Sequence, residues 1–339
     1  MARRSGPLAA AWTSIVNLRR RRPESRTDPF DQYAADLGVD TVLASEVGQF
    51  HTFAIPRISA LLRRTGEYHN DGVRRLDDTK ALMAAPLTRG PDSAEGREAI
   101  AQINRIHAQY AIRNDDYLYV LSTFGFGSER WNERYGWRPI TDSEKRMLYE
   151  RIRCTGVAMG IDGVPADGEE LRRWVDNYLD ENRRSHPDNH ALAEAMMCAV
   201  EAMVPRIVRP LVSPVTRVWM GDPELLAALG YSLPPRPMVW AVNGAMALRK
   251  WFLARFTAMR GRDFFDLFLA NHLSSRPDGF TSYRELGPMA LLEKFGRRED
   301  PGAVGAEDQR TRPSVDPPSE GPLTTADQSG NAATVATVE

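Results

Sequence analysis

The body of the chain, residues 29–296, has the composition and periodicity of helices almost throughout, and this feature restricts the fold more than any other. Ala, Leu, Met, Arg and Glu dominate it, whereas the alternating Val, Ile and Thr runs typical of strands are scarce. Thr141-Asp142-Ser143-Glu144 is a capping box, in which the Thr and Glu side chains satisfy backbone N–H groups of a first helical turn. The sequence therefore predicts an all-α fold in a single multi-helix globular domain.

The expected helices follow from caps and from the spacing of apolar residues. Asp40, Asp71 and Ser93 are placed as N-caps of helices that run to about residues 50, 83 and 110. Further helices are expected to begin near residues 114 and 141 and to span 169–182, 191–204, 223–229 and 238–258. Three prolines, Pro205, Pro210 and Pro214, predict an irregular connection between the helices on either side of them.

The two ends of the chain differ from the body in charge. Residues 1–29 carry seven Arg against two acids, a net charge of +5, and residues 1–28 are expected to form a flexible basic N-terminus. Residues 297–339 have a net charge of -4 and no aromatic residue. Such a segment cannot bury enough surface to offset its ordering entropy, so we expect a disordered acidic tail. The whole chain has a formal charge of -1, which gives no signature of nucleic-acid binding.

Composition also indicates where in the cell the protein is expected. The mean hydropathy is -0.43, and no stretch approaches the roughly 18 uninterrupted apolar residues of a spanning helix. Cys154 and Cys198 form neither a CxxC motif nor a disulfide framework, so we expect a reducing cytoplasm. The run Arg19–Arg22 allows a peripheral contact of the basic N-terminus with anionic lipid.

Familiar catalytic motifs are missing. The chain has no P-loop, GxSxG or HExxH sequence, and Gly125-Phe-Gly127 lacks the third glycine of a dinucleotide loop. His186 and His190 are four residues apart, as metal ligands on a helix are, but Pro187 between them favours a turn and an N-cap.

One histidine lies on an apolar helical stripe. Ile100, Ile103, His107 and Tyr110 recur at spacings of three and four, so they share one face of the helix expected after Ser93. A neutral imidazole on such a stripe is what an axial haem ligand needs. Taken alone, a histidine in such a pattern is more often a hydrogen-bonded residue of the core than a haem ligand.

A second segment combines charge with helical spacing. Arg75 and Thr79 are four residues apart and lie on one face of the expected helix. Arg74 and Asp78 have the same spacing and can pair across a turn. Read without other information, these are also ordinary surface residues of a helix.

Both segments resemble a known family, the haem oxygenases that include the mycophenolic-acid side-chain-cleaving enzyme of fungi and the latex-clearing rubber oxygenases. The resemblance is carried by Ile106-His107-Ala-Gln-Tyr110-Ala-Ile112-Arg-Asn114-Asp115-Asp116-Tyr117-Leu118-Tyr119-Val-Leu-Ser122, by Arg74-Arg75-Leu-Asp77-Asp78-Thr79 and by Glu129-Arg-Trp131-Asn-Glu-Arg-Tyr135-Gly136-Trp137-Arg-Pro-Ile-Thr141. It covers about residues 55–165 and reaches neither end of the chain.

The resemblance implies an all-helical domain that holds haem b between its helices. His107 would be the ligand of the iron, and Arg75 and Thr79 would lie on the distal side as cofactor-binding and catalytic residues that donate hydrogen bonds toward oxygen. The implied activity is that of a haem b-dependent oxygenase, an oxidoreductase that uses O2 to cleave or oxidise a carbon–carbon double bond of a small apolar substrate, for which an isoprenoid chain is suitable. Asn104 and Asn114 are candidates to orient the second ring nitrogen of His107, or plain surface and capping residues.

One departure and two alternatives stand beside this interpretation. The rubber oxygenases have a Lys immediately before the distal Thr, where this sequence has Asp78, and the Asp-Asp-Thr segment agrees better with the fungal branch. A non-catalytic helical protein that binds haem or a lipid would share the same pattern. A helical regulator whose basic N-terminus contacts nucleic acid is disfavoured by the nearly neutral body.

Overall fold

The computed structural model describes residues 29–256, 275–276 and 279–299. Within these residues it contains helices and no β-strand, which confirms the predicted all-α class. The expected flexible N-terminus, residues 1–28, lies outside the described residues, as does the expected tail from residue 300 onward. The last described helix includes residues 297–299, the first three residues of the expected tail.

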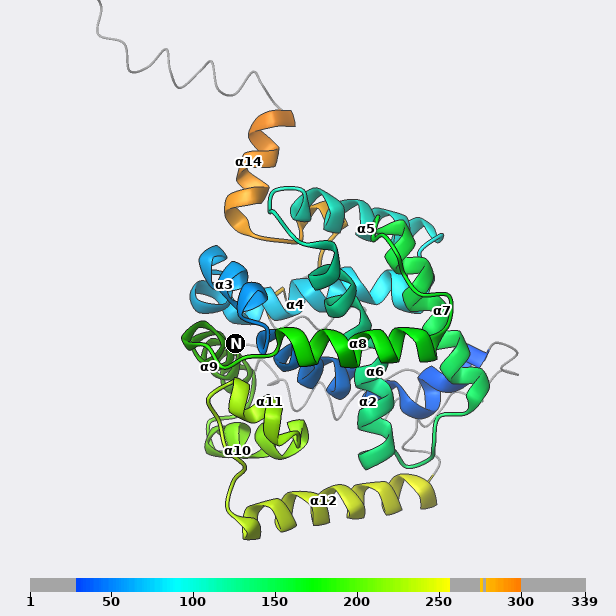
Figure 1. The fold of residues 1–339 in the computed structure, drawn as a ribbon, viewed down its shortest axis with the longest axis vertical. Coiled ribbons are helices and arrows are strands. Elements are labelled where there is room, and N and C mark those ends of the chain that lie inside the picture. The colour runs from blue at the N-terminus through cyan, green and yellow to red at the C-terminus, as the bar shows by residue number, and fades with distance from the viewer. Residues whose placement is uncertain (1–28, 257–274, 277–278, 300–339) are drawn as a thin grey trace, which may run out of the picture. The chain divides into compact units, whose positions relative to one another are not determined.

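The helices follow one another in the order shown in Figure 1. Their bounds are α2 (Pro29–Phe53), α3 (Pro56–Thr65), α4 (Glu67–Thr88), α5 (Ala94–His107), α6 (Asn114–Tyr135), α7 (Asp142–Ala158), α8 (Gly168–Asn182), α9 (Pro187–Met203), α10 (Arg209–Met220), α11 (Pro223–Ala228), α12 (Arg236–Arg255), a 3-10 turn η3 (Tyr283–Glu285) and α14 (Met289–Glu299). The chain divides into two units, residues 1–293 and 294–339. The predicted domain boundaries at residues 28 and 296 stay a prediction.

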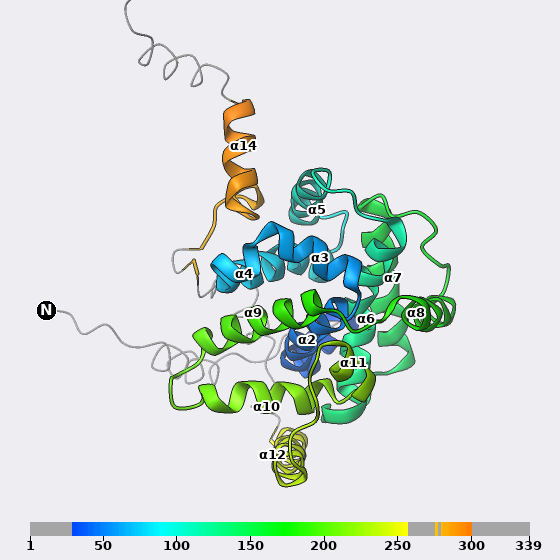
Figure 2. The ribbon, with the colours of Figure 1, turned by 60° about the vertical axis from the view of Figure 1, so that its left-hand side comes forward.

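The core of the first unit forms where α2 packs along α6, and where α4 packs against both α5 and α9 (Figure 2). Large side chains from these helices interlock there, among them Phe50, Phe53, Leu76, Trp131 and Met196, all nearly or fully buried. Burying such side chains is the main stabilising contribution to a fold of this kind. None of the helices among the described residues has the length and apolar character needed to cross a bilayer.

The expectation that a helix begins at Asp40 is wrong. α2 starts at Pro29 and runs through Asp40 without a break. The Asp40 carboxylate is buried, accepts the indole N–H of Trp131 at 2.8 Å and pairs with Arg249 at 2.9 Å. Because these partners come from α6 and α12, the carboxylate is satisfied by tertiary contacts and has no capping role.

Pro205 lies in the irregular connection between α9 and α10, as expected, but the two prolines after it do not prevent a helix, which corrects a second expectation. α10 spans Arg209–Met220 and includes both Pro210 and Pro214. Pro210 lies in the first turn, where a backbone N–H has no helical partner in any case. Pro214 removes one helical hydrogen bond, and the buried side chains of Val218 and Met220 hold the helix against the core.

The start of α4 determines where Arg75 and Thr79, the candidate distal residues, lie. Gly66 separates α3 from α4 with φ of 73°, a left-handed conformation that a side chain would strain. Asp71 has non-helical dihedral angles inside α4, so the helix is kinked at the position where a new helix was expected to begin. At the next residue, a Cβ on Gly72 would lie 2.8 Å from the Cβ of Ala199, so the glycine permits close approach of α4 to α9.

Candidate functional site

A cavity of about 780 Å³ lies among α2, α3, α4 and α6 beside the C-terminal end of α5. Its size is within the range of small-molecule and cofactor sites. Most of its wall is apolar, and the apolar residues that line it include Ile58, Leu61, Ile112, Val120 and Phe124. The cavity therefore offers a site for a largely apolar group.

The three residues singled out in the sequence, Arg75, Thr79 and His107, all line this cavity. Arg75 and Thr79 come from α4 and His107 from α5, so the fold brings together two segments that are separate in the chain. This convergence places all the predicted site residues around one cavity.

His107 is the last residue of α5, which differs from its expected place in mid-helix. Ser93 caps the start of α5 as predicted, by accepting the backbone N–H of Gly96 at 2.9 Å. The helix then ends early in tight turns, in which the N–H of Gln109 bonds to Ile106 and that of Tyr110 to His107. The imidazole of His107 therefore projects from the C-terminal end of α5 and forms part of the cavity wall.

Tyr117, in the first turn of α6, is the hydrogen-bonding partner of His107. Its hydroxyl group contacts Nδ1 of His107, and the two rings meet edge to face with centroids 4.9 Å apart. Burial lowers the pKa of His107 to about 4, with a further contribution from the charge of Arg75. Burial also raises the pKa of Tyr117, so both groups are neutral near pH 7.

A neutral imidazole carries one proton, on either Nδ1 or Nε2. The contact with Tyr117 helps to determine which of the two nitrogens carries it. If Nδ1–H donates to the Tyr117 oxygen, Nε2 keeps its lone pair and can bind a metal. The sequence proposal that Asn104 or Asn114 takes this role is wrong, because Asn104 donates to the carbonyl of Ala158 and Asn114 bonds to the backbone of Asp162. The signal for Tyr117 was its helical spacing from Val120 and Phe124, which line the same cavity.

Arg75 and Thr79 form one hydrogen-bonded unit on α4. The Arg75 guanidinium donates to the hydroxyl oxygen of Thr79, which in turn donates its proton to the Arg75 carbonyl at 2.8 Å. The guanidinium also lies over the ring of Tyr68, 5.3 Å from its centroid. In this arrangement Thr79 orients Arg75, and the hydroxyl proton is already engaged by the backbone.

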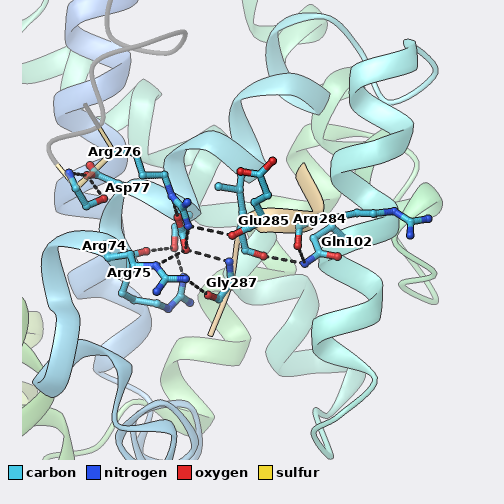
Figure 3. Close-up of polar contacts among 12 residues, drawn as sticks. Arg74, Arg75, Asp77, Gln102, Arg276, Arg284, Glu285 and Gly287 are labelled. Carbon is cyan, nitrogen blue, oxygen red and sulfur yellow. Dashed lines mark hydrogen bonds and ion pairs between the residues drawn. The ribbon is translucent and has the colours of Figure 1, made fainter. Parts of the chain in front are cut away.

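The two carboxylates between them, Asp77 and Asp78, do not line the cavity. Asp78 accepts hydrogen bonds from Nε of Arg276 at 3.0 Å and from the N–H of Gly287 at 2.9 Å, and Asp77 accepts two from Ser275 (Figure 3). The predicted pair between Arg74 and Asp78 is also present at 3.6 Å. Asp77 and Asp78 thus fasten Ser275, Arg276 and Gly287 to α4.

Arginines outnumber acids around the cavity. Its lining includes five arginines, Arg57, Arg63, Arg64, Arg75 and Arg113, and two acids, Asp116 and Asp188. Both acids are used in ion pairs, Asp116 with Arg57 and Asp188 with Arg63. Arg113 is paired as well, with Asp115 outside the lining, so the remaining positive charge is that of Arg64 and Arg75. This charge suits a ligand that is apolar in its body and carries carboxylates at one edge.

The remaining histidine pair does not form a metal site. His186 caps α9 by accepting the N–H of Asp188, as its position before Pro187 predicted. His190 contacts the carbonyl of Leu229 through Nδ1 at 3.0 Å. No cluster of three or more His, Cys, Asp or Glu residues that could hold a metal ion occurs in the part of the chain that the structure describes.

Comparisons with known proteins agree with the sequence resemblance. The chain is 25% identical over 276 residues to the ER-bound oxygenase mpaB′ of Penicillium brevicompactum, a match that covers 75% of this chain and 64% of the relative. It is 27% identical over 286 residues to the ER-bound oxygenase mpaB of the same species (79% and 69%), and 26% identical over 199 residues to mpaB of Penicillium roqueforti strain FM164 (53% and 67%). The chain thus spans about two thirds of the length of these relatives.

Among solved structures, the latex clearing protein LCP in the closed state matches 78% of this chain and 80% of its own, with 17% identity and a TM-score of 0.48. The family model described as "ER-bound oxygenase mpaB/B′/Rubber oxygenase, catalytic domain" matches residues 39–251, which include every residue that lines the cavity. The chain therefore belongs to the family of mpaB-type and rubber oxygenases, through their catalytic domain.

Proposed function

We propose that the chain is a haem b-dependent oxygenase that binds haem through His107 and oxidises a carbon–carbon double bond of an apolar substrate. The observation that carries this proposal is the meeting of His107, Arg75 and Thr79 at one cavity, in a chain that belongs to an oxygenase family.

The residues at the cavity fit haem in three respects. His107 is neutral near pH 7 and has a hydrogen-bonding partner at Nδ1, which leaves Nε2 for iron. The apolar side chains of Ile112, Val120 and Phe124 suit the face of a porphyrin. The arginines suit its two propionate groups, for which Arg64 is a candidate, because Arg113 is already paired with Asp115.

The protein's own contribution to catalysis would be orientation and charge. Tyr117 would hold the imidazole of His107 in one orientation and one tautomer. Arg75, fixed by Thr79 and by the ring of Tyr68, would supply a positive charge where negative charge develops on oxygen. Bound haem would supply the redox chemistry that lets O2 react with a double bond.

The apolar wall also supports the proposed class of substrate. Binding an unsaturated hydrocarbon chain would rest on burial of apolar surface, at roughly 25 cal/mol per Å². An isoprenoid chain suits a wall of this composition. A cytoplasmic location, expected from the two cysteines, stays a prediction, as does membrane contact through residues 1–28.

Oxygen uptake by the purified haem-loaded protein tests this function. We expect consumption of O2 with a prenylated substrate and formation of carbonyl products, and none with the saturated analogue of that substrate. Haem binding without any O2 consumption across such substrates would instead support the alternative of a non-catalytic haem- or lipid-binding protein, which the largely apolar cavity would also allow.

A further inference from the structure

α12 (Arg236–Arg255) is attached to the rest of its unit along one narrow face. Only Val242 and Met246 of this helix are buried. Arg249 adds an ion pair with Asp40, and Asn243 accepts a hydrogen bond from Tyr135 at 3.2 Å. Figures 1 and 2 both show the helix at the margin of the first unit, beyond α6 and α10. The contacts on this face hold α12 in place, but they involve few of its apolar residues.

The opposite face of α12 is apolar and exposed. Trp240, Leu248 and Trp251 recur at spacings of eight and three, which place them on one side of the helix. They are 71%, 64% and 58% exposed. Single exposed apolar residues are ordinary on protein surfaces, but two tryptophans and a leucine aligned along one helix mark a site of interaction.

The aromatic surface continues past the C-terminal end of the helix. Phe252 and Phe256 are 39% and 44% exposed, and their ring centroids lie 4.5 Å apart. Both rings also contact Trp251 edge to face. We call Trp240, Leu248, Trp251, Phe252 and Phe256 the outer face of α12. Trp and Phe rings of this kind favour the boundary between water and lipid acyl chains.

The charge of α12 has one sign. The helix contains four basic residues and no acidic one. Arg249 is used in the pair with Asp40, whereas Arg236, Lys250 and Arg255 are exposed and form no ion pair with any residue that the structure describes. These cations flank the outer face and complement an anionic surface.

We propose that the outer face of α12 binds the surface of an anionic lipid bilayer, with the helix lying in the plane of the interface. Aromatic rings would enter the headgroup region while the neighbouring cations contact lipid phosphate and carboxylate groups. A second copy of the chain fits this face less well, because a symmetric pairing would bring the cations of both helices together with no acid on either helix to offset them. The proposal does not depend on the oxygenase chemistry proposed above.

Co-sedimentation of the full-length protein with lipid vesicles tests the proposal. We expect binding to vesicles of phosphatidylcholine mixed with phosphatidylserine, weaker binding to phosphatidylcholine alone, and weakening with added salt. Replacing both tryptophans (Trp240→Ser with Trp251→Ser) should reduce the partition coefficient by about tenfold or more. Lys250→Glu and Arg255→Glu should each reduce it by about fivefold or more.

Matched controls separate this face from the rest of the surface. Val157→Ser changes an apolar side chain on α7 that is 59% exposed, and Arg173→Glu changes an exposed cation on α8. Neither should alter binding by more than about twofold, since each lies outside the proposed contact. All these positions are exposed, so unchanged thermal unfolding is expected for every variant.

Three outcomes would overturn the proposal. The wild-type protein could fail to bind the mixed vesicles, which would mean that the outer face is covered in solution. The double tryptophan variant could bind as well as the wild type, which would assign binding elsewhere, such as to the basic residues 1–28. Light scattering could show a dimer that the tryptophan substitutions dissociate, which would identify a second copy as the occupant.

Discussion

Tyr117 and His107 form a hydrogen-bonded pair that joins the start of α6 to the end of α5. The residues are ten positions apart, and the chain between them turns so that the two rings meet at the cavity. The pair fixes the orientation of the one histidine that the family resemblance assigns to iron. The hydroxyl of Tyr117 stays protonated because burial raises its pKa.

Replacing Tyr117 with Phe removes this hydroxyl and keeps the ring. We expect haem still to bind, with affinity lower by about 10- to 100-fold, because partners of metal-bound histidines contribute about this much. Haem titration followed by absorbance measures the loss. The matched control is Tyr149→Phe, which removes a hydroxyl that bonds to the Pro165 carbonyl away from the cavity. Equal affinities for wild type and Tyr117→Phe would contradict the positioning role.

Arg75 and Thr79 should differ in their effects on turnover. Arg75→Leu removes the positive charge at the cavity and is expected to lower kcat by about 100-fold or more, as loss of a donor to developing negative charge does. Thr79→Val removes only the hydroxyl that orients Arg75, so a loss of about tenfold is expected, with the haem spectrum intact. Steady-state oxygen uptake measures both, and Arg89→Leu, at the exposed residue that follows α4, is the control. A larger effect of Thr79→Val than of Arg75→Leu would reverse the assigned roles.

Sequence patterns succeeded where the determinants are local. The Thr141 capping box and the start of α6 at Asn114 were predicted from neighbouring residues, and both are confirmed. The predicted pair of Arg74 with Asp78 lies within one helical turn and is confirmed for the same reason. The common cavity of His107, Arg75 and Thr79 was expected from resemblance to a family, since no local pattern relates α4 to α5.

Tertiary contacts explain the errors. Asp40 has the residue type of a cap, but its carboxylate is bound by Trp131 and Arg249, which lie 91 and 209 residues away in the chain. Tyr117 was missed because only the early end of α5 brings it to His107. The role of Asp78 could not be read from sequence either, since its partner Arg276 is 198 residues distant.

Asp78→Ala should destabilise the fold by about 3 kcal/mol, because it leaves the Arg276 guanidinium and the Gly287 N–H without their buried acceptor. Urea unfolding measures this change. Limited proteolysis should also cut the chain near Arg276 and Gly287 sooner, since both residues lose their contact with Asp78.

The control for this prediction is Asp115→Ala, which breaks the exposed pair with Arg113 and should cost less than about 1 kcal/mol. Comparable stability of the Asp78 and Asp115 variants would mean that the Asp78 contacts with Arg276 and Gly287, which are among those drawn in Figure 3, contribute little to stability.

His51 makes stability depend on pH. Burial, assisted by the charge of Arg130, lowers its pKa in the folded protein to about 3, against about 6.5 in the unfolded chain. Between these values the unfolded chain binds more protons, so the free energy of unfolding falls as pH falls, by roughly 1 kcal/mol per pH unit. His107 is also buried with a lowered pKa and should add a similar slope, so urea unfolding of the wild type at pH 7, 6 and 5 should show about twice this dependence. His51→Gln should reduce the slope by about half, whereas His186→Gln, at an exposed position, should leave it unchanged. An unchanged slope in His51→Gln would place the titrating group elsewhere.

The visible absorption spectrum of the protein loaded with haem, compared between wild type and His107→Ala, tests the central claim most directly. The account predicts a Soret band in the wild type that is lost or shifted in His107→Ala and unchanged in His69→Ala, which alters an exposed histidine of α4. A wild-type protein that takes up no haem, or a His107→Ala spectrum identical to that of the wild type, would contradict the assignment of His107 as the iron ligand.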